Sequence, residues 1–389
     1  MSEKMQDRSS LLLIRNARRY APEYIGVGDI LIGGGRILSL QSGIEPGHGV
    51  PCRVIAAEGQ LAVPGFVDSL AHISGGGGEG GFASRTIALL PSQAFAAGVT
   101  TMMGALGTDD VTRSHADLLA SARALNAHGL SVYALTGSYR VPVRTLTGSV
   151  RDDLVLIPDF IGVGELAIAD HRGSQPSVEE LARIASDARV GGLLAGKGGV
   201  VLVHVGDAAD GLDSIDLASQ RYPVPMRQWH PTHINRQRAL LLQGIDWARR
   251  GGSVDLTTST TPECIASGEV PAAQALAELL AAGVAIERIS MSSDGQASLP
   301  HFDAHGTLLS MGVASLSSLS EAMFDAVRHH GVPFESALRA ITASPAGIWG
   351  LKRKGVLSAG ADADVVLLDP DTLMPLTTIA RGRLQTPIL

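Results

Sequence analysis

The sequence predicts an α/β protein: a TIM-like (β/α)8 barrel with a small β domain that is built from both chain termini. The middle of the chain alternates short apolar runs with longer stretches of helical periodicity, which is typical of βαβ units and a parallel sheet. The two ends differ, because glycine and other turn residues interrupt their short strands. We therefore expect a barrel over residues 61–350 and a small β domain formed by residues 1–60 and 351–389.

Eight candidate strands of the barrel are apolar almost throughout, as strands that are covered on both faces should be. They are expected at 61–72, 99–106, 131–138, 160–169, 200–206, 227–235, 253–259 and 289–294. Amphipathic stretches between them predict helices at 114–128, 177–190, 236–250 and 271–282. Eight strands joined by crossover helices favour a closed barrel over an open sheet.

Shorter strands are expected at both ends of the chain, separated by turn residues. They lie at 11–21, 28–32, 35–40, 54–59, 360–369 and 377–383. A single β domain assembled from both termini, with the barrel inserted between them, fits this arrangement.

Composition excludes several classes of protein. The chain of 389 residues has a formal net charge of -7, so no basic footprint indicates nucleic-acid binding. Two cysteines, Cys52 and Cys264, are too few for a disulfide framework. The first ten residues are polar, unlike a signal peptide, and no apolar run reaches the roughly 18 residues of a membrane span. We therefore expect a cytoplasmic protein with no nucleic-acid or membrane partner.

Five chemically capable side chains lie at the carboxyl ends of different predicted strands. They are His72, Glu165, His204, His233 and Asp294. Barrel enzymes gather their catalytic groups at these ends. One histidine at a strand end is more often structural, but five such groups at separate strand ends predict metal or acid–base chemistry.

Several short motifs then occur in a fixed order along the chain. They are PGFVD at 64–68, GGGGE at 75–79, LTGSY at 135–139, DHR at 170–172, HVGD at 204–207, PTHINR at 231–236 and SSDG at 292–295. This ordered set resembles the isoaspartyl (β-aspartyl) dipeptidase family of the amidohydrolase superfamily, from about residue 11 to about residue 383. The resemblance implies a zinc-dependent hydrolase that acts on small dipeptides and forms homo-oligomers.

The family binds two zinc ions, and this sequence departs from its ligand set twice. Leu70 stands where the first histidine of a His-x-His pair is expected. No lysine occurs between Lys4 and Lys197, so strand four cannot supply the family's bridging carbamate. Glu165 is the natural replacement. The resemblance then implies one tightly bound zinc on three protein ligands, with a weak second site possible. The predicted metal ligands are Glu165, His204 and His233, with His72 and Asp294 for the weaker position.

The resemblance also implies roles around the metal. Asp294 would accept a proton from metal-activated water and pass it to the departing amine. Glu79 would hold the free amine of the substrate, and Tyr139 would polarise the scissile carbonyl. Two arginines would hold the substrate carboxylates as bidentate partners. The predicted substrate-binding residues are Gly77, Glu79, Thr108, Tyr139, Arg172, Arg236 and Ser298.

Three functional interpretations stay open. The first is zinc-dependent hydrolysis of isoaspartyl dipeptides. The second is a related amidohydrolase that acts on another N-acyl amino acid, since one fold hosts many amide hydrolyses. The third is a metal-poor paralogue that binds such ligands without cutting them, which Leu70 supports. Zinc content and turnover of β-Asp-Leu would separate the three.

Overall fold

The structure is a computed structural model that describes residues 11–47, 49–302 and 308–385. Six parallel strands form its central sheet, in the order β11-β10-β9-β8-β7-β6. Their bounds are β6 (Phe66–Ala71), β7 (Val99–Gly104), β8 (Ser131–Thr136), β9 (Phe160–Ile168), β10 (Val200–Val205) and β11 (Trp229–Thr232). Two more strands, β12 (Val254–Thr257) and β13 (Ile289–Ser292), pair in parallel with each other.

The β12–β13 pair lies between the two edges of the curled six-stranded sheet. Ile234 N, just after β11, donates a hydrogen bond to Asp255 O of β12. His72 N, just after β6, donates to Gly295 O beyond β13. The α/β class is therefore confirmed, and every predicted barrel strand contains one of these eight strands.

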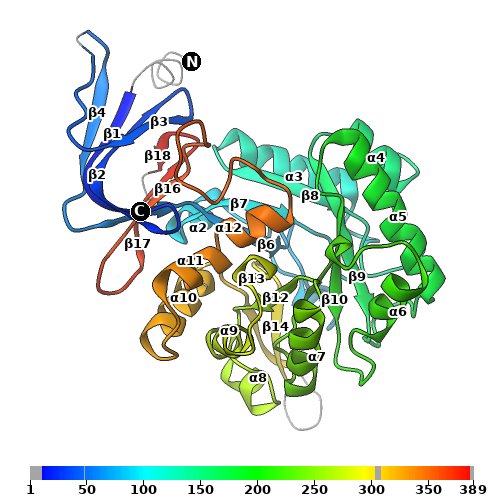
Figure 1. Ribbon diagram of the computed structural model, residues 1–389. Coiled ribbons are helices and arrows are strands. Elements are labelled where there is room, and N and C mark those ends of the chain that lie inside the picture. The colour runs from blue at the N-terminus through cyan, green and yellow to red at the C-terminus, as the bar shows by residue number, and fades with distance from the viewer. Residues whose placement is uncertain (1–10, 48, 303–307, 386–389) are drawn as a thin grey trace.

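Helices cover the outer side of the parallel strands, as Figure 1 shows. The longer ones are α3 (His115–Ala127), α5 (Val178–Ala195), α6 (Asp213–Arg221), α7 (Arg238–Arg249), α9 (Ala272–Ala281) and α10 (Ser318–Arg328). The shorter ones are α2 (Pro91–Ala96), α4 (Val150–Leu156), α8 (Pro262–Ala266), α11 (Phe334–Ala340), α12 (Ala343–Ile348), η1 (Phe82–Ser84), η2 (Met226–Gln228) and η3 (Ile286–Arg288). The four predicted helices are confirmed as α3, α5, α7 and α9.

Helix boundaries follow local signals in the sequence. Helix α5 begins with a capping box, in which the Ser177 and Glu180 side chains each accept a hydrogen bond from the backbone N–H of the other residue. It ends at Gly196, whose φ of 67° suits glycine. Among the described residues, no helix combines the length and the apolar character that crossing a bilayer requires.

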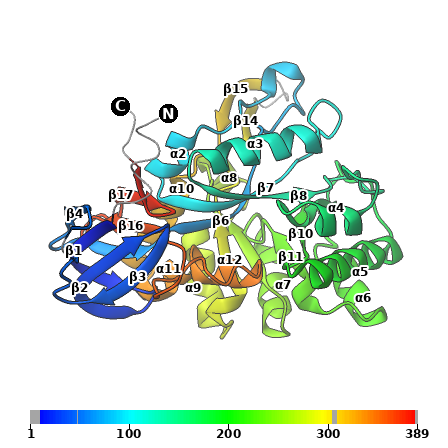
Figure 2. The ribbon, with the colours of Figure 1, turned by 90° about the horizontal axis from the view of Figure 1, so that it is seen from above.

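Strands from both ends of the chain form one mixed sheet, in the order β18-β17-β16-β5-β1-β2-β3, with β4 paired to β1. The bounds are β1 (Leu11–Tyr20), β2 (Tyr24–Gly33), β3 (Arg36–Gln41), β4 (Cys52–Ala56), β5 (Leu61–Pro64), β16 (Val365–Leu368), β17 (Pro375–Ala380) and β18 (Arg383–Gln385). Figure 2 shows this sheet at one side of the parallel strands. A hairpin of β14 (Ser298–Phe302) and β15 (Leu308–Val313) follows β13.

The predicted strand 61–72 divides into two, which corrects the expectation of one continuous strand. Its first part, β5, pairs with β16 in the mixed sheet, and its second part is β6 of the parallel sheet. Gly65 separates them and passes so close to Thr100 that a Cβ there would lie 2.2 Å from the Thr100 hydroxyl oxygen. A side chain would prevent this approach, so glycine allows the chain to change sheets.

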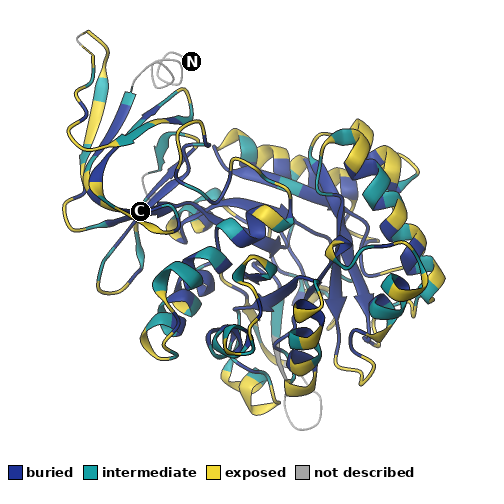
Figure 3. Cartoon of the chain, in the orientation of Figure 1, coloured by how far each residue is buried: buried dark blue, intermediate teal, exposed yellow. Residues whose placement is uncertain are grey.

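The parallel strands are buried along their length, whereas the helices expose their outward faces (Figure 3). One cluster of buried apolar side chains contains Val67, Leu70, Met103, Leu135, Leu202 and Trp349. It gathers residues from β6, β7, β8 and β10, so apolar packing supports the strand ends that carry the candidate site.

Candidate active site

Three predicted metal ligands come together at the carboxyl ends of β9, β10 and β11. Glu165 Oε1 lies 2.9 Å from His204 Nδ1 and 3.1 Å from His233 Nε2. All three side chains are buried, and one ligand atom from each lies within 4.8 Å of the others. Neighbouring parallel strands end at one edge of a sheet, which is why residues 68 positions apart meet here.

Both histidines direct one ring nitrogen at Glu165 and the other at a second partner. His204 Nε2 lies 2.8 Å from Asp170 Oδ2. Burial opposes ionisation of Asp170, but hydrogen bonds from His204 and Arg172 hold its pKa well below the usual value. The ionised carboxylate only accepts, so His204 Nε2 carries a proton, and Nδ1 is the nitrogen directed at Glu165 that a metal would bind.

His233 is kept in the neutral form that binds metals. Its Nδ1 lies 2.6 Å from the Thr257 hydroxyl, which leaves Nε2 facing Glu165. Burial and the charge of Arg236 lower the pKa of His233 to about 4. Partners of this kind orient metal-binding histidines and select their tautomer.

His72 and Asp294 form a pair beside this group and are not part of it. His72 Nε2 lies 3.2 Å from Asp294 Oδ1 and 3.9 Å from Glu165 Oε2. Burial disfavours the imidazolium, but the carboxylates of Asp294 and Glu165 raise the pKa of His72 to about 9. The pair is therefore an ion pair at neutral pH.

A buried carboxylate oxygen indicates that a cation fits between these residues. Glu165 Oε2 has no hydrogen-bond partner within the described part of the chain, whereas Asp294 Oδ1 pairs with His72 Nε2 at 3.2 Å. Burying a charged oxygen without a partner is costly, and a metal ion would remove that cost. One carboxylate and two neutral imidazoles are also a composition that zinc accepts.

Leu70 occupies the place of the missing family ligand without supplying a donor atom. Its side chain is fully buried in the apolar cluster that contains Met103 and Leu202. Asp68, two residues earlier, is engaged elsewhere, because it accepts hydrogen bonds from Ser293 N at 3.0 Å and from the Ser293 hydroxyl at 2.5 Å. Neither residue belongs to the group that gathers around Glu165.

Replacing Leu70 by histidine is expected to raise the metal content from the one ion per chain that the sequence predicts toward two. The new imidazole would complete a His-x-His pair with His72, beside Asp294. Burying an unpaired imidazole in the metal-free protein should cost about 1–3 kcal/mol of stability. Metal analysis and thermal unfolding measure both effects, with Leu70→Gln as a control for polar burial. Metal content that stays at one per chain in Leu70→His would contradict this expectation.

Replacing Asp68 by asparagine is expected to flatten the pH dependence of stability. Burial, with the charge of Asp255 nearby, raises the pKa of Asp68 to about 7. An acid whose pKa is raised on folding takes up a proton, so its contribution to stability is present below its unfolded pKa of about 4 and is lost as pH rises to about 7. An asparagine side chain cannot ionise, so its contribution to stability does not change over this pH range.

The free energy of unfolding, measured with urea, should therefore fall less between pH 4.5 and pH 8 in Asp68→Asn than in the unaltered protein. The difference should be a few kcal/mol, on the order of 1.4 kcal/mol per pKa unit. Asp210→Asn, at an exposed aspartate, is the control. An Asp68→Asn difference that is the same at both pH values would refute the assignment.

All seven predicted substrate-binding residues line one small cavity. The cavity has a volume of about 60 Å³, and His72 and Asp294 also line it. Its predicted residues are Gly77, Glu79, Thr108, Tyr139, Arg172, Arg236 and Ser298. Glu165, His204 and His233 do not line the cavity, but its wall residues Tyr139 and Arg172 contact His204.

Opposite charges face each other across this cavity. Arg172 Nη1 lies 3.8 Å from Glu79 Oε1, and Arg236 Nη2 lies 3.9 Å from Asp294 Oδ2. Thr108 donates a hydrogen bond to Glu79. A carboxylate and two guanidinium groups are therefore available to a ligand that carries both signs of charge.

Tyr139, in the loop after β8, contacts the three candidate metal ligands through His204. Its hydroxyl lies 2.7 Å from His204 Nδ1. Burial and the nearby charge of Glu165 raise the pKa of Tyr139 well above its usual value. The phenol therefore keeps its proton and can donate a hydrogen bond at the centre of the site.

Asp170 and Arg113 are two further residues of this site that were not predicted from the sequence. Asp170 binds both His204 and Arg172, with Arg172 Nη2 at 2.6 Å, and its signal was its place in the DHR motif. Arg113 donates to the carbonyl oxygens of Gly76 at 2.8 Å and Gly77 at 3.2 Å. It therefore supports the glycine-rich loop, but no sequence pattern distinguishes this arginine from a surface one.

Comparisons with known proteins identify the family of the chain. The sequence model of the amidohydrolase family matches residues 239–388. A β-aspartyl dipeptidase of Fervidobacterium islandicum AW-1, solved in complex with a β-Asp-Leu dipeptide, is 39% identical, with 97% of this chain and 96% of that chain covered and a TM-score of 0.90. A second structure of a β-aspartyl dipeptidase from that organism is 37% identical, with 96% of each chain covered and a TM-score of 0.87. A dihydroorotase of Lactiplantibacillus plantarum is 25% identical over 92% of this chain and 89% of its own length.

Proposed function

The chain belongs to the β-aspartyl dipeptidase family of the amidohydrolase superfamily and is a metal-dependent hydrolase, and from this we propose that it hydrolyses isoaspartyl dipeptides with one zinc ion. One observation carries the proposal. Asp294 and the opposite charges of Glu79 and Arg172 line a single small cavity, and Tyr139 and Arg172 of its wall contact His204 of the Glu165 group. That arrangement suits a zwitterionic peptide more than a neutral amide.

Glu165, His204 and His233 would hold the metal. Zinc bound there would polarise the scissile carbonyl and lower the pKa of water to about 7. The unpaired Oε2 of Glu165, among the described residues, supports this location. Asp170 and Thr257 would keep the two imidazoles in the tautomers that bind metal.

Asp294 would act as the general base. Burial would raise its pKa, but the ion pair with His72 lowers it, so the carboxylate is ionised and ready to accept a proton. It would take that proton from the attacking water as the new C–O bond forms, and return it to the amine nitrogen as the C–N bond breaks. Tyr139 would donate its hydroxyl proton in a hydrogen bond to the carbonyl oxygen as negative charge develops there.

The charged groups of the substrate would bind to the oppositely charged side chains that face each other across the cavity. Glu79 would bind the free ammonium group, and Arg172 and Arg236 would bind the carboxylates. A dipeptide would then replace the 3.8 Å contact between Arg172 and Glu79 with two contacts to itself. The site would favour ligands that offer both signs of charge.

The direct test compares β-Asp-Leu with α-Asp-Leu on protein whose zinc content has been measured. We expect hydrolysis of the β-linked peptide at one zinc per chain and little hydrolysis of the α-linked isomer, because the isomer moves one carboxylate relative to the scissile bond. Two fully occupied metal sites would overturn the mononuclear assignment. Equal hydrolysis of both isomers would overturn the proposed specificity.

A second candidate is hydrolysis of a cyclic amide, which the dihydroorotase similarity favours. Dihydroorotate carries a carboxylate but no free amine, so Glu79 would have no partner in it. Assay of dihydroorotate beside β-Asp-Leu separates the two functions. Another N-acyl amino acid, the alternative expected from the sequence, would likewise leave Glu79 unpaired.

We also propose that β6–β13 close as a single (β/α)8 barrel that begins at β6 and not at residue 61, that β5 belongs to the small β domain built from both ends of the chain, and that the chain forms a homo-oligomer. The hydrogen bonds from Ile234 to Asp255 and from His72 to Gly295, which join the two parallel sheets, support closure. Light scattering after size-exclusion chromatography measures the oligomeric state.

A further inference from the structure

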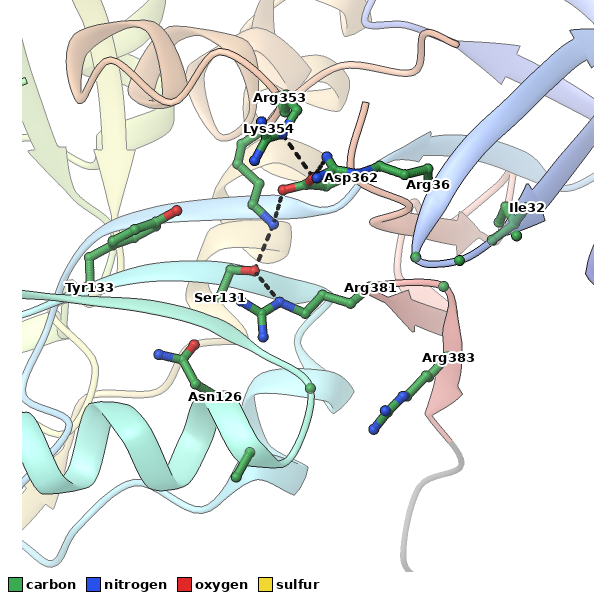
Figure 4. A pocket seen from close by; sticks show the side chains of 16 residues that line it. Ile32, Arg36, Asn126, Ser131, Tyr133, Arg353, Lys354, Asp362, Arg381 and Arg383 are labelled. Carbon is green, nitrogen blue, oxygen red and sulfur yellow. Dashed lines mark hydrogen bonds and ion pairs between the residues drawn. The ribbon is translucent and has the colours of Figure 1, made fainter. Parts of the chain in front are cut away.

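A second and larger cavity lies at the junction of the mixed sheet and the parallel sheet. Its volume is about 580 Å³. It touches the β2–β3 hairpin, the end of α3, the start of β8 and the C-terminal strands (Figure 4). Ser131, the first residue of β8, lines it, whereas Tyr139 of the candidate active site follows the other end of that strand. The two cavities are therefore separate.

Positive charge dominates this junction cavity. Five cationic residues line it: Arg36, Arg353, Lys354, Arg381 and Arg383. Asp362 is the one acidic residue among its described lining residues, and Asp364 lies behind it. Five cations therefore face two carboxylates, which leaves an excess of three positive charges.

Three of the cations are already paired. Asp362 forms ion pairs with Arg36, with Arg353 at 3.3 Å and with Lys354 at 2.9 Å. Lys354 is buried, and its ammonium group also lies 2.6 Å from Asp364 and donates to the Ser131 hydroxyl at 2.6 Å. This part of the wall is therefore rigid and preorganised.

Arg381 and Arg383 have no carboxylate partner among residues 11–47, 49–302 and 308–385. Arg381 Nε donates to the Ser131 hydroxyl at 3.2 Å, so its terminal nitrogens stay available. Figure 4 shows both side chains extending from the C-terminal strands into the same space. Gly382 packs against the hairpin so closely that a Cβ would lie 3.1 Å from Gly35 Cα, and this contact holds the arginine-bearing turn in place.

We propose that the junction cavity binds a small phosphate-bearing molecule. Arginine guanidinium groups bind phosphate oxygens in pairs, and two unpaired ones beside a buried lysine match the several oxygens of a phosphate group. The volume exceeds the need of inorganic phosphate and falls in the range of about 300–1,000 Å³ typical of small-molecule sites. Tyr133 and Asn126 line the rest of the wall and face the organic part of the ligand.

Calorimetric titration of the full-length protein at low salt tests the proposal with AMP, pyrophosphate and citrate. AMP and pyrophosphate should bind, and added salt should weaken both, because the interaction is electrostatic. Citrate separates phosphate recognition from general attraction of anions and should bind more weakly. Arg383→Glu, which forms no side-chain hydrogen bond or ion pair among the described residues, should weaken AMP binding by at least about tenfold.

Two matched variants locate the binding. Arg183→Ala, at an exposed arginine of α5, should leave the affinity for AMP unchanged. Arg236→Ala should also leave it unchanged, because Arg236 lines the other cavity. Arg383→Glu should retain the folded circular dichroism spectrum and the hydrolysis rate of the unaltered protein, so this test stands whether or not β-Asp-Leu is the substrate.

Each other outcome overturns the proposal. Absence of AMP and pyrophosphate binding would exclude a phosphate site. An affinity for citrate equal to that for pyrophosphate would show that the cavity attracts anions in general and does not recognise phosphate. Loss of AMP binding in Arg236→Ala with retention in Arg383→Glu would place the ligand in the candidate active site. A change in oligomeric state in Arg383→Glu without anion binding would identify the cavity wall as a contact between copies of the chain.

Discussion

Asp294→Asn is expected to lower kcat and kcat/KM together by about 10²–10⁴-fold, with KM nearly unchanged. The Asp294 carboxylate is ionised and lies at the edge of the Glu165 cluster, with its Oδ1 3.2 Å from His72 Nε2. Asn keeps the size of the side chain but cannot accept and return a proton. A group that acts only in the transition state affects kcat and leaves ground-state binding intact.

Steady-state kinetics on β-Asp-Leu, with metal content measured on the same samples, provides the test. Asp210→Asn, at an exposed aspartate after β10, should behave like the unaltered protein. Turnover within a few-fold of normal in Asp294→Asn would remove this residue from the proton transfer. A rise in KM alone would mean that Asp294 binds substrate through Arg236.

Glu165→Gln is expected to abolish stable metal binding, with an affinity loss greater than the roughly 10–100-fold that loss of an outer partner causes. Glu165 Oε1 is the only atom that lies within hydrogen-bonding distance of both His204 Nδ1 and His233 Nε2 among the described residues. Gln removes the negative charge that offsets a divalent cation in this buried site. Hydrolysis should fall with metal occupancy.

Metal analysis after dialysis measures the loss, and circular dichroism confirms that the variant is folded. Glu278→Gln, at a helix glutamate paired with Arg238, is the matched control and should retain its metal. Excess zinc should restore part of the activity of Glu165→Gln if affinity is the defect. Full metal retention after dialysis would show that other residues hold the ion.

The sequence predicted the elements of the parallel sheet well, because buried strands and amphipathic helices have distinct apolar patterns. Strand ends then located His204 and Glu165, since parallel strands bring their carboxyl ends together. The division at Gly65 was not predicted. The apolar run continues through that residue, and only the neighbouring Thr100 makes the change of sheet visible.

Other features of the site depend on backbone geometry that no sequence pattern records. His233, directly after β11, and Asp294, two residues after β13, have left-handed backbones, with φ of 63° and 51°. Such values are uncommon for residues other than glycine and are maintained by the surrounding structure. The contacts of Asp170 and Arg113 likewise join residues that only the folded chain brings together.

The mixed sheet also constrains the order in which the chain can fold during synthesis. Strand β5 pairs with β16 through Val63 and Val366, roughly 300 residues apart. A growing chain would therefore complete β1, β2, β3 and β5 long before β16, the C-terminal partner of β5, leaves the ribosome. Until then β5 has an open edge, which is a template for pairing with other chains. We expect closure of this edge to be a late and slow step of folding, after the parallel strands have assembled.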